Sequence, residues 1–208
     1  LIGNCPEYYL FNDELQVINN NKKIFQNYFN DVREIIELGP GSTHAVENKT
    51  LPILSLAPNL QCYTPIDNNK YFLNELYKII KRNFPSININ LIENDITNSI
   101  NYGSYEMVYG KKCVLFLGIT LGNFTKVKQK QILNNLYNIL TSEDFIIVSL
   151  DNNMNEYSLK KAYNNSYMKT LIFGILNYFS LINPSFSSYI NSFKYEYEWD
   201  KANSLVNM

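Results

Sequence analysis

The residues with the clearest capacity for chemistry stand where an apolar run ends, in the segment Glu37-Leu38-Gly39-Pro40-Gly41. A glycine-rich turn after a buried strand lets a ligand approach the backbone where side chains would otherwise block it. Dinucleotide-binding proteins combine such a turn with a further glycine, three residues after the second one. In this chain that position holds His44, which weakens the interpretation of the turn as a dinucleotide site.

The spacing of the acid and the two glycines resembles the first motif of class I S-adenosylmethionine (SAM) methyltransferases, whose turn borders the methionine part of the cofactor. This resemblance implies that Gly39 and Gly41 bind SAM. Asp67 and Asp95 follow the next two apolar runs, and ligands of open α/β sheets bind at the carboxyl ends of strands. We therefore predict that Asp67 accepts hydrogen bonds from the ribose hydroxyls and Asp95 from the adenine amino group. The structural alternatives are a helix cap for Asp67 and a turn for Asp95.

The elements that must position these residues follow from the pattern of apolar side chains. Continuous apolar runs predict strands at 34–38, 60–66, 87–92, 113–118 and 144–150. Helical spacing predicts helices from Asn12 or Asp13 to about Phe29, at 42–48 (ending before Pro52), at 68–84 and at 126–140. This alternation is typical of an α/β fold with a parallel sheet covered on both faces. We expect the Rossmann-like sheet of class I methyltransferases, with an additional substrate-side element.

The alternation ends after Asp151. Residues 158–182 are rich in aromatic side chains and predict two helices or one broken helix, and residues 192–199 alternate as a strand does. We expect three parts: an N-terminal helical segment (1–30) that contributes to the substrate pocket, a SAM-binding domain (31–151) and a partial substrate-recognition element (152–208). A complete sheet of this class ends in an antiparallel pair of strands, of which the sequence shows at most one. The chain is therefore expected to be part of a longer protein.

Four segments carry a more specific resemblance. They are Pro6-Glu7-Tyr8-Tyr9, the glycine turn, the run from Phe116-Leu117-Gly118 through Ile119-Thr120-Leu121-Gly122-Asn123-Phe124, and Asp151 followed by Leu159 and Ala162-Tyr163. In this order they resemble the histidine-specific N-alpha-methyltransferase family, which includes the ergothioneine-pathway enzyme that trimethylates histidine. The third segment is the most specific, because it is not a general methyltransferase motif. The resemblance implies a SAM-dependent enzyme that methylates the α-amino group of a free amino acid, with histidine as the leading candidate.

The same resemblance implies the substrate-binding residues. Asn123 and Tyr163 would hold the amino and carboxylate groups of the amino acid. One tyrosine of the Tyr8-Tyr9 pair, with Tyr9 favoured, would line the pocket for its side chain. The alternative for the two tyrosines is ordinary packing, since the chain has 17 tyrosines. No catalytic residue is assigned, because the expected reaction is an in-line attack of the deprotonated amine on the sulfonium methyl group, in which the protein contributes positioning and desolvation.

The chain also departs from the family pattern. Ile119 stands where the family usually has serine, and Phe11 and Asn12 stand where it usually has a Thr-Arg pair. The family residues that grip the imidazole lie in a segment that would follow Met208. These departures keep two alternatives open: a SAM-dependent methyltransferase of another small molecule, and a catalytically silent binding domain with the same fold. A dehydrogenase is the least favoured class.

Composition weighs against several other functions. The formal net charge is −1 and the pI is about 5.9, which gives no electrostatic footprint for nucleic acid or an anionic membrane. The longest apolar stretch is too short to span a bilayer. Three widely spaced cysteines and a single histidine form no metal-binding set and favour a reducing compartment. We therefore expect a cytoplasmic protein with a small-molecule substrate, no metal, and no nucleic-acid or membrane partner.

Overall fold

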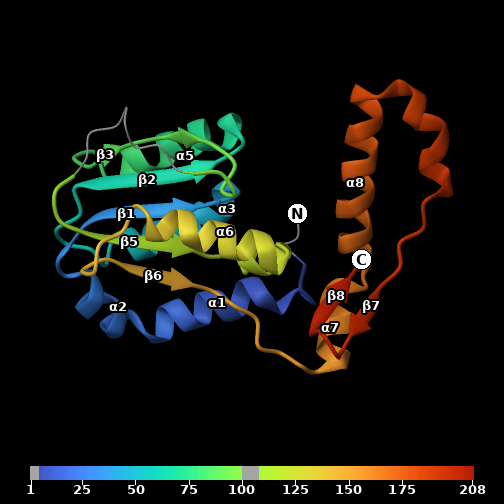
Figure 1. Ribbon diagram of the computed structural model, residues 1–208, viewed down its shortest axis with the longest axis horizontal. Coiled ribbons are helices and arrows are strands. Elements are labelled where there is room, and N and C mark those ends of the chain that lie inside the picture. The colour runs from blue at the N-terminus through green and yellow to red at the C-terminus, as the bar shows by residue number, and fades with distance from the viewer. Residues whose placement is uncertain (1–4, 100–107) are drawn as a thin grey trace. The chain divides into compact units, whose positions relative to one another are not determined.

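The computed structural model describes residues 5–99 and 108–208 (Figure 1). The chain forms two compact units. Asp13–Leu150 forms the first, here termed the sheet unit, and Leu1–Asn12 together with Asp151–Met208 forms the second, the helical unit. The predicted division at residues 30 and 151 into three functional parts stays a prediction.

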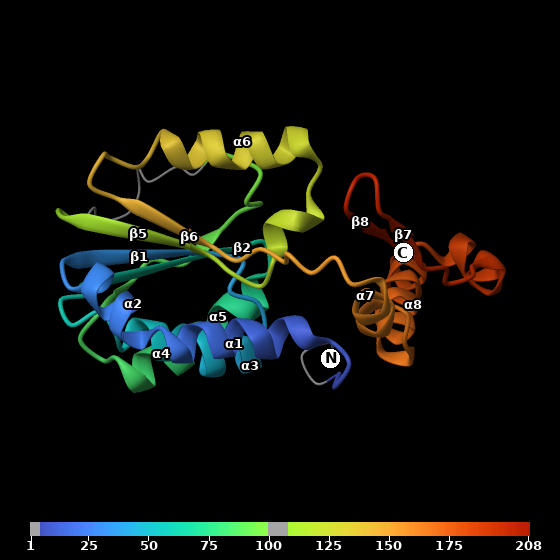
Figure 2. The ribbon, with the colours of Figure 1, turned by 90° about the horizontal axis from the view of Figure 1, so that it is seen from below.

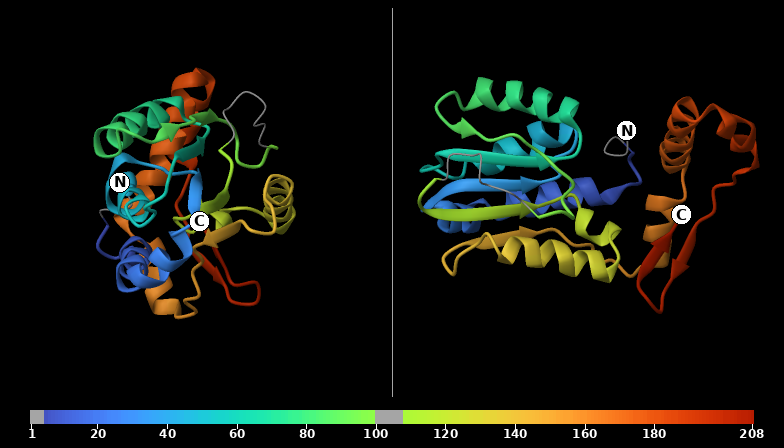
Figure 3. Two further views of the ribbon diagram at one scale, coloured as in Figure 1. Left: turned by 90° about the vertical axis from the view of Figure 1, so that its left-hand side faces the viewer. Right: turned by 45° about the horizontal axis from the view of Figure 1, so that its top comes forward.

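The sheet unit is built on a parallel sheet, and its strands point in the same direction (Figure 3, right). The strands follow one another across the sheet in the order β3-β2-β1-β5-β6, and β4 also pairs with β2. Their bounds are β1 Val32–Leu38, β2 Cys62–Asp67, β3 Asn88–Ile89, β4 Ile92–Glu93, β5 Lys111–Phe116 and β6 Phe145–Val148. The predicted parallel α/β fold is confirmed.

The strand order reverses beside β1. The chain builds the sheet outward from β1 through β2 to β3 and β4, and then places β5 and β6 on the other side of β1. In open α/β sheets such a reversal opens a crevice at the carboxyl ends of the two central strands, and ligands bind there. Here those strands are β1 and β5.

Helices cover both faces of the sheet (Figure 2). One face carries α6 (Lys126–Tyr137). The other face carries α1 (Tyr9–Asn20), α2 (Lys22–Phe29), α3 (Thr43–Ala45), the π turn η2 (Val46–Thr50), α4 (Leu51–Leu54) and α5 (Lys70–Asn83). Because each strand is buried on two sides, its sequence is a continuous apolar run rather than an alternating one.

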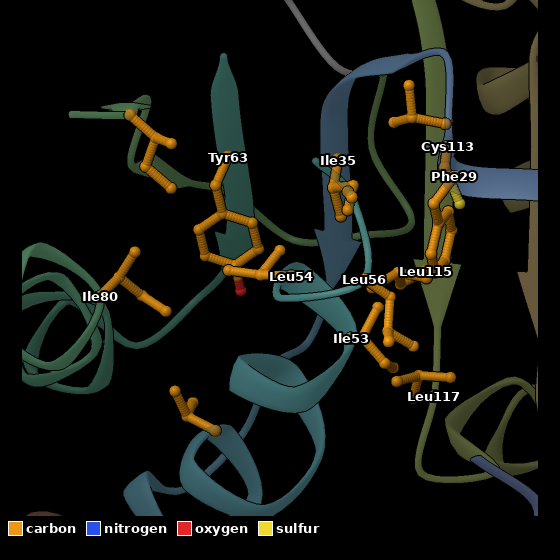
Figure 4. Close-up of a cluster of buried hydrophobic side chains, with 14 of the residues drawn as sticks. Phe29, Ile35, Ile53, Leu54, Leu56, Tyr63, Ile80, Cys113, Leu115 and Leu117 are labelled. Atoms are coloured by element: carbon orange, nitrogen blue, oxygen red, sulfur yellow. The ribbon is translucent and has the colours of Figure 1, made fainter. Parts of the chain in front are cut away.

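The core is divided by the sheet into two clusters. Ile35 and Ile36 are neighbours in β1 and point to opposite faces, as successive strand residues must. Ile35 belongs to the cluster that packs on α4 and α5, with Tyr63 and Ile80 among its members (Figure 4). Ile36 belongs to the cluster that includes Ile132 of α6. Both clusters are fully buried at these positions, so the central strands form a rigid support for the turns at their ends.

The N-terminal helix differs from its prediction. It begins at Tyr9 rather than at Asn12 or Asp13, and it is broken into α1 and α2 at Asn21. The Asn21 backbone leaves the helical region (φ −113°, ψ 19°), and its side-chain amide donates to the Val17 carbonyl at 2.8 Å. Asparagine side chains compete in this way for backbone groups that would otherwise continue a helix.

The segment after the glycine turn also differs. The predicted helix ends before Pro52, whereas the chain continues through η2 into α4. Ser42 caps the start of α3 by accepting the Ala45 amide. Pro52 lies in α4, just after the π turn, and Thr50 and Leu51 before it keep helical backbone angles, so the helical run does not end before the proline. The predicted strand 87–92 is split into β3 and β4, with poor strand formers such as Asn90 between them.

In the helical unit two helices follow one another, α7 (Glu156–Tyr163) and α8 (Ser166–Ile182). After the 3₁₀ segment η4 (Pro184–Ser192), an antiparallel pair forms from β7 (Glu198–Asp200) and β8 (Leu205–Asn207). The strand predicted at 192–199 is therefore wrong except at its last two residues. In the described part of the chain no helix is both long and apolar enough to cross a membrane.

Candidate functional site

The glycine turn at the end of β1 has the geometry that its sequence predicts. Gly39 and Gly41 have φ values of +62° and +76°, which side chains rarely adopt. The Gly39 amide donates to the Ile66 carbonyl at 2.8 Å, so the turn is tied to the end of β2. A Cβ atom built on Gly39 would meet nothing within 4 Å. The turn therefore presents an open stretch of backbone at the switch point.

Asp67 is the last residue of β2 and faces this turn. Its Oδ1 accepts the Asn69 amide at 2.8 Å, and the Gly41 amide also bonds to its carboxylate. Burial raises the pKa of Asp67, and these backbone amides oppose the rise. The structure thus brings three of the predicted cofactor residues together: Gly39, Gly41 and Asp67.

Asp95 follows the neighbouring strand. β4 pairs with β2, with Glu93 in register with Asp67, and Asp95 lies two residues beyond it. The Asp95 Oδ1 accepts the Thr97 amide at 2.8 Å and the Thr97 hydroxyl at 2.7 Å. These bonds lower the pKa of this exposed carboxyl. Asp95 therefore lies in a turn, as the structural alternative to cofactor binding predicted. It also lies at the edge of the sheet where the cofactor is predicted to bind.

A small hollow lies at the switch point itself. Its volume is about 40 Å³, and it is lined by Glu37, Gly39, Pro40, Ala45, Lys49, Thr50, Leu117 and Gly118. A polar site of this size has room for a small polar group. The residues come from the ends of β1 and β5, from α3 and from the π turn.

Polar side chains around this hollow are buried and bonded. Glu37 accepts the Thr50 hydroxyl at 3.0 and 3.1 Å and also accepts the Tyr63 hydroxyl. Burial raises the pKa of Glu37 to about 7, against the effect of these hydrogen bonds. Glu14 of α1 forms an ion pair with Lys49 and accepts the Gly118 amide at 2.8 Å.

A larger hollow of about 420 Å³ is lined by Gln26, Asn27, Asn30, Ser55, Leu56 and Pro58. Asn30 and Leu56 precede β1 and β2, so this hollow lies at the amino ends of the strands. Its lining residues carry no charge. The candidate functional residues therefore lie at the carboxyl ends of the strands.

Asn123 ends the 3₁₀ turn η3 (Thr120–Asn123), shortly after β5, and its side chain is exposed. Ile119, just before this turn, has φ +59° and ψ 18°, a conformation that is strained for a β-branched residue. Its amide donates to the Ser149 hydroxyl at 3.0 Å, and its carbonyl accepts the Gly122 amide at 3.1 Å. These bonds hold the turn in the strained conformation.

The two predicted substrate tyrosines lie in the helical unit. The Tyr9 hydroxyl donates to Asp151 Oδ2 at 2.7 Å. The rings of Tyr8 and Tyr163 meet edge to face, with centroids 5.9 Å apart. Burial and the neighbouring Tyr8 raise the pKa of Tyr163, and the Tyr195 hydroxyl donates to the Tyr163 carbonyl. Asn123 belongs to the sheet unit, so a substrate shared by Asn123, Tyr9 and Tyr163 stays a prediction.

Sequence reasoning missed Glu14, Lys49, Thr50 and Tyr63. Glu14 gives no local signal, because its partner Gly118 is 104 residues away. Lys49 and Thr50 fall beyond the helix predicted at 42–48. A charged residue inside an apolar segment is a usable signal, and in β1 both Glu34 and Glu37 provide it.

Comparison with known proteins finds a matching family and similar relatives. A family model described as "Histidine-specific methyltransferase, SAM-dependent" matches residues 1–208. The histidine N-alpha-methyltransferase of Mycolicibacterium smegmatis is 24% identical over 210 residues, and that of Mycobacterium tuberculosis is 23% identical over 211. Each match covers 100% of this chain and 63% of the relative.

Among solved structures, a plantazolicin methyltransferase in complex with a desmethyl substrate analogue and S-adenosylhomocysteine matches 82% of this chain. That match covers 66% of the other chain, with 17% identity and a TM-score of 0.45. A SAM-dependent methyltransferase from Clostridium acetobutylicum matches 66% of this chain and 57% of its own, with 14% identity and a TM-score of 0.42.

Proposed function

The chain belongs to the SAM-dependent histidine-specific methyltransferase family, and on this premise we propose that the protein methylates the α-amino group of a free amino acid, with histidine as the leading substrate. The observation that carries the proposal is the joining of the glycine turn to Asp67 at the carboxyl ends of β1 and β2. A bound SAM molecule supplies a methyl group on a positively charged sulfonium. The residues at this edge of the sheet fit such a cofactor.

Each part of SAM has a candidate partner. The exposed backbone of Gly39 and Gly41 suits the methionine part, since no side chain blocks it. Asp67 accepts from the ribose hydroxyls, and its bonds to backbone amides fix the direction of its carboxylate. Asp95 accepts from the adenine amino group, and its bond to Thr97 holds it in place. Charged acceptors make the stronger hydrogen bonds in proteins.

The amino acid is held by Asn123, Tyr163 and Tyr9 in this proposal. The pairing of Tyr9 with Asp151 and the packing of Tyr8 on Tyr163 support it, because these contacts pre-organise the two tyrosines. The protein's part in the reaction is to orient the amine in line with the methyl group and to exclude water. The amine must be deprotonated to attack.

A specific observation favours a second candidate, a SAM-dependent methyltransferase of another small molecule. Ile119 is an apolar residue directly before the turn that Asn123 ends, and its backbone conformation is strained. The chain also spans 63% of the length of the curated relatives that it matches. In the described part of the chain, Cys5, Cys62 and Cys113 form no disulfide, which supports the proposal of a cytoplasmic location.

Two measurements test the proposal on the purified protein, together with any sequence that its gene adds to residues 1–208. Calorimetric titration with SAM, S-adenosylhomocysteine and NAD should give binding of the first two. Incubation with SAM and a panel of amino acids, followed by mass spectrometry, should add methyl groups to histidine. Asn123→Ala should lose this transfer and keep SAM binding. Methylation of a different class of molecule alone would establish the second candidate, and failure to bind SAM would leave a silent fold.

A further inference from the structure

One buried carboxylate joins two segments of the switch-point hollow. Glu14, on α1, has 8% of its surface exposed, and Lys49 has 6%. One carboxylate oxygen of Glu14 pairs with the Lys49 ammonium, and the other accepts the Gly118 amide at 2.8 Å. Lys49 and Gly118 both line the hollow beside Gly39. Glu14 therefore clamps the π turn after β1 to the turn after β5.

Stability alone is a weak reason for such an arrangement. Removing two charges from water is costly, and replacing a buried ion pair by apolar side chains is often neutral or stabilising. The rest of this region offers an apolar alternative, since Val46 on the same turn and Leu117 beside Gly118 are buried. A charged pair at this position is better explained by a charged ligand.

The charges around the hollow indicate which ligand. Among the described residues that line it, Lys49 carries the one positive charge, and Glu37 is a second carboxyl group. The methionine end of SAM carries a carboxylate and an ammonium. A hollow of about 40 Å³ has room for one such group. Lys49 is the partner for the carboxylate, and the backbone turns supply further polar groups.

We propose that Glu14 is a positioning residue of the cofactor site, which holds the Lys49 ammonium and the Gly118 turn at the hollow to receive the amino-acid end of SAM. This inference rests on the proposed function. Glu14 acts in two ways. It is the counter-ion that makes a charged lysine tolerable in a buried position, and it fixes the direction of the Gly118 peptide through its amide.

The test compares two ligands that differ only at this end. S-adenosylhomocysteine has the amino-acid end, and 5′-methylthioadenosine keeps the nucleoside and the thioether without it. Glu14→Gln keeps an acceptor for Gly118 and removes the charge. It should weaken S-adenosylhomocysteine binding by about tenfold or more, the range for a lost charged hydrogen bond. Binding of 5′-methylthioadenosine should change less than about twofold. A purely structural role would weaken both ligands alike.

Matched variants complete the design. Lys49→Met should show the same selective loss, and Glu14→Gln/Lys49→Met should be no weaker than Lys49→Met, because Glu14 acts through Lys49. A single variant leaves an unpaired buried charge and can fail to fold for that reason. In that case the affinities of the double variant for the two ligands are compared instead. Glu34→Gln alters another buried glutamate of the same sheet, bonded to Thr64, and should change neither affinity. Asp67→Ala should weaken both ligands.

Two results would overturn the inference. If Glu14→Gln lowers the affinity for both ligands equally, the role of Glu14 is structural. If the affinity for both ligands is unchanged, Glu14 plays no part in the cofactor site. If the unaltered protein binds neither ligand, the proposed function fails first, which the same titrations reveal before any variant is made.

Discussion

The Tyr9 hydroxyl donates a hydrogen bond of 2.7 Å to Asp151 Oδ2, although 142 residues separate the two side chains. The other carboxylate oxygen of Asp151 accepts the Asn153 amide at 2.9 Å, which fixes its orientation. An ionised carboxylate only accepts hydrogen bonds. The Tyr9 hydroxyl therefore gives its proton to Asp151, and in the proposed site its oxygen would act as an acceptor toward a polar group of the substrate side chain, whose pocket Tyr9 lines.

Tyr9→Phe should raise the KM for the amino acid by about tenfold, because it removes this acceptor. Asp151→Ala should have a similar effect, and Asp151→Asn a smaller one, since the amide oxygen can still accept from Tyr9. SAM affinity should stay unchanged in all three. Steady-state kinetics at saturating SAM measure the effect, and Tyr157→Phe, an exposed tyrosine of α7, is the control. An unchanged KM in Tyr9→Phe would exclude Tyr9 from the substrate site.

Asp67→Ala should weaken SAM binding by roughly tenfold or more, the consequence of losing a hydrogen bond to a charged acceptor worth about 1.5–3 kcal/mol. Calorimetric titration gives the affinity. Asp31→Ala removes an exposed carboxylate before β1 and should leave the affinity as it was. Equal affinities for the Asp67 variant and the unaltered protein would remove the cofactor assignment while leaving the fold intact.

The parts of the site that the sequence could predict are those whose cause is local. Gly39 and Gly41 are needed for the positive φ angles of one turn, and Asp67 is predictable because it ends a continuous apolar strand. The parallel sheet was predictable for the same reason, since burial on two faces leaves an apolar run.

The rest depends on contacts between distant segments. Glu14 lies on a helix whose sequence predicts only an amphipathic surface element, and its role depends on Gly118. The π turn that buries Lys49 and Thr50 has no periodicity of its own to detect. The alternating residues 193–197 resemble a strand, but Tyr195 bonds to the Tyr163 carbonyl instead of joining a ladder.

Gly41→Ala should lower the free energy of unfolding by about 1–2 kcal/mol, because φ is +76° at this position. Gly174→Ala should instead raise the free energy of unfolding. Gly174 lies in α8 with open space around its Cα, so alanine should stabilise the helix by about 0.5–1 kcal/mol. Urea unfolding of both variants measures whether each change lowers or raises the free energy of unfolding. Equal effects would contradict the strained geometry of the turn.

Ile119→Asn should raise the free energy of unfolding by up to about 1 kcal/mol. Asparagine tolerates the left-handed conformation that Ile119 adopts at φ +59°, and a β-branched residue there costs about 1–2 kcal/mol. Loss of its half-buried side chain reduces the gain. Val127→Asn, at an exposed helical position of α6, removes a β-branched residue without strain and should not stabilise. Destabilisation by Ile119→Asn greater than that by Val127→Asn would show that packing outweighs strain.

Glu37 should make stability fall as the pH rises. Its pKa in the folded protein is raised from 4.5 to about 7, so between these values the folded state binds more protons than the unfolded state. Stability then decreases with pH across this window. The loss is absent below pH 4.5 and complete above pH 7. A shift of this size corresponds to about 3 kcal/mol.

Glu37→Gln removes this titration. Tyr63 and Thr50 both donate to Glu37, so the glutamine amide adds an unfavourable contact, but that cost is nearly the same at every pH. The difference in unfolding free energy, variant minus unaltered protein, should therefore rise by about 3 kcal/mol between pH 4.5 and 8. Urea unfolding across this range measures it, with the exposed Glu75→Gln as the control. The neighbouring charges of Glu14 and Lys49 are present in both proteins and cancel in the difference. Parallel pH profiles for Glu37→Gln and the unaltered protein would mean that burial does not raise the pKa of Glu37 above its unfolded value, and that Glu37 adds a negative charge beside the Glu14–Lys49 pair at neutral pH.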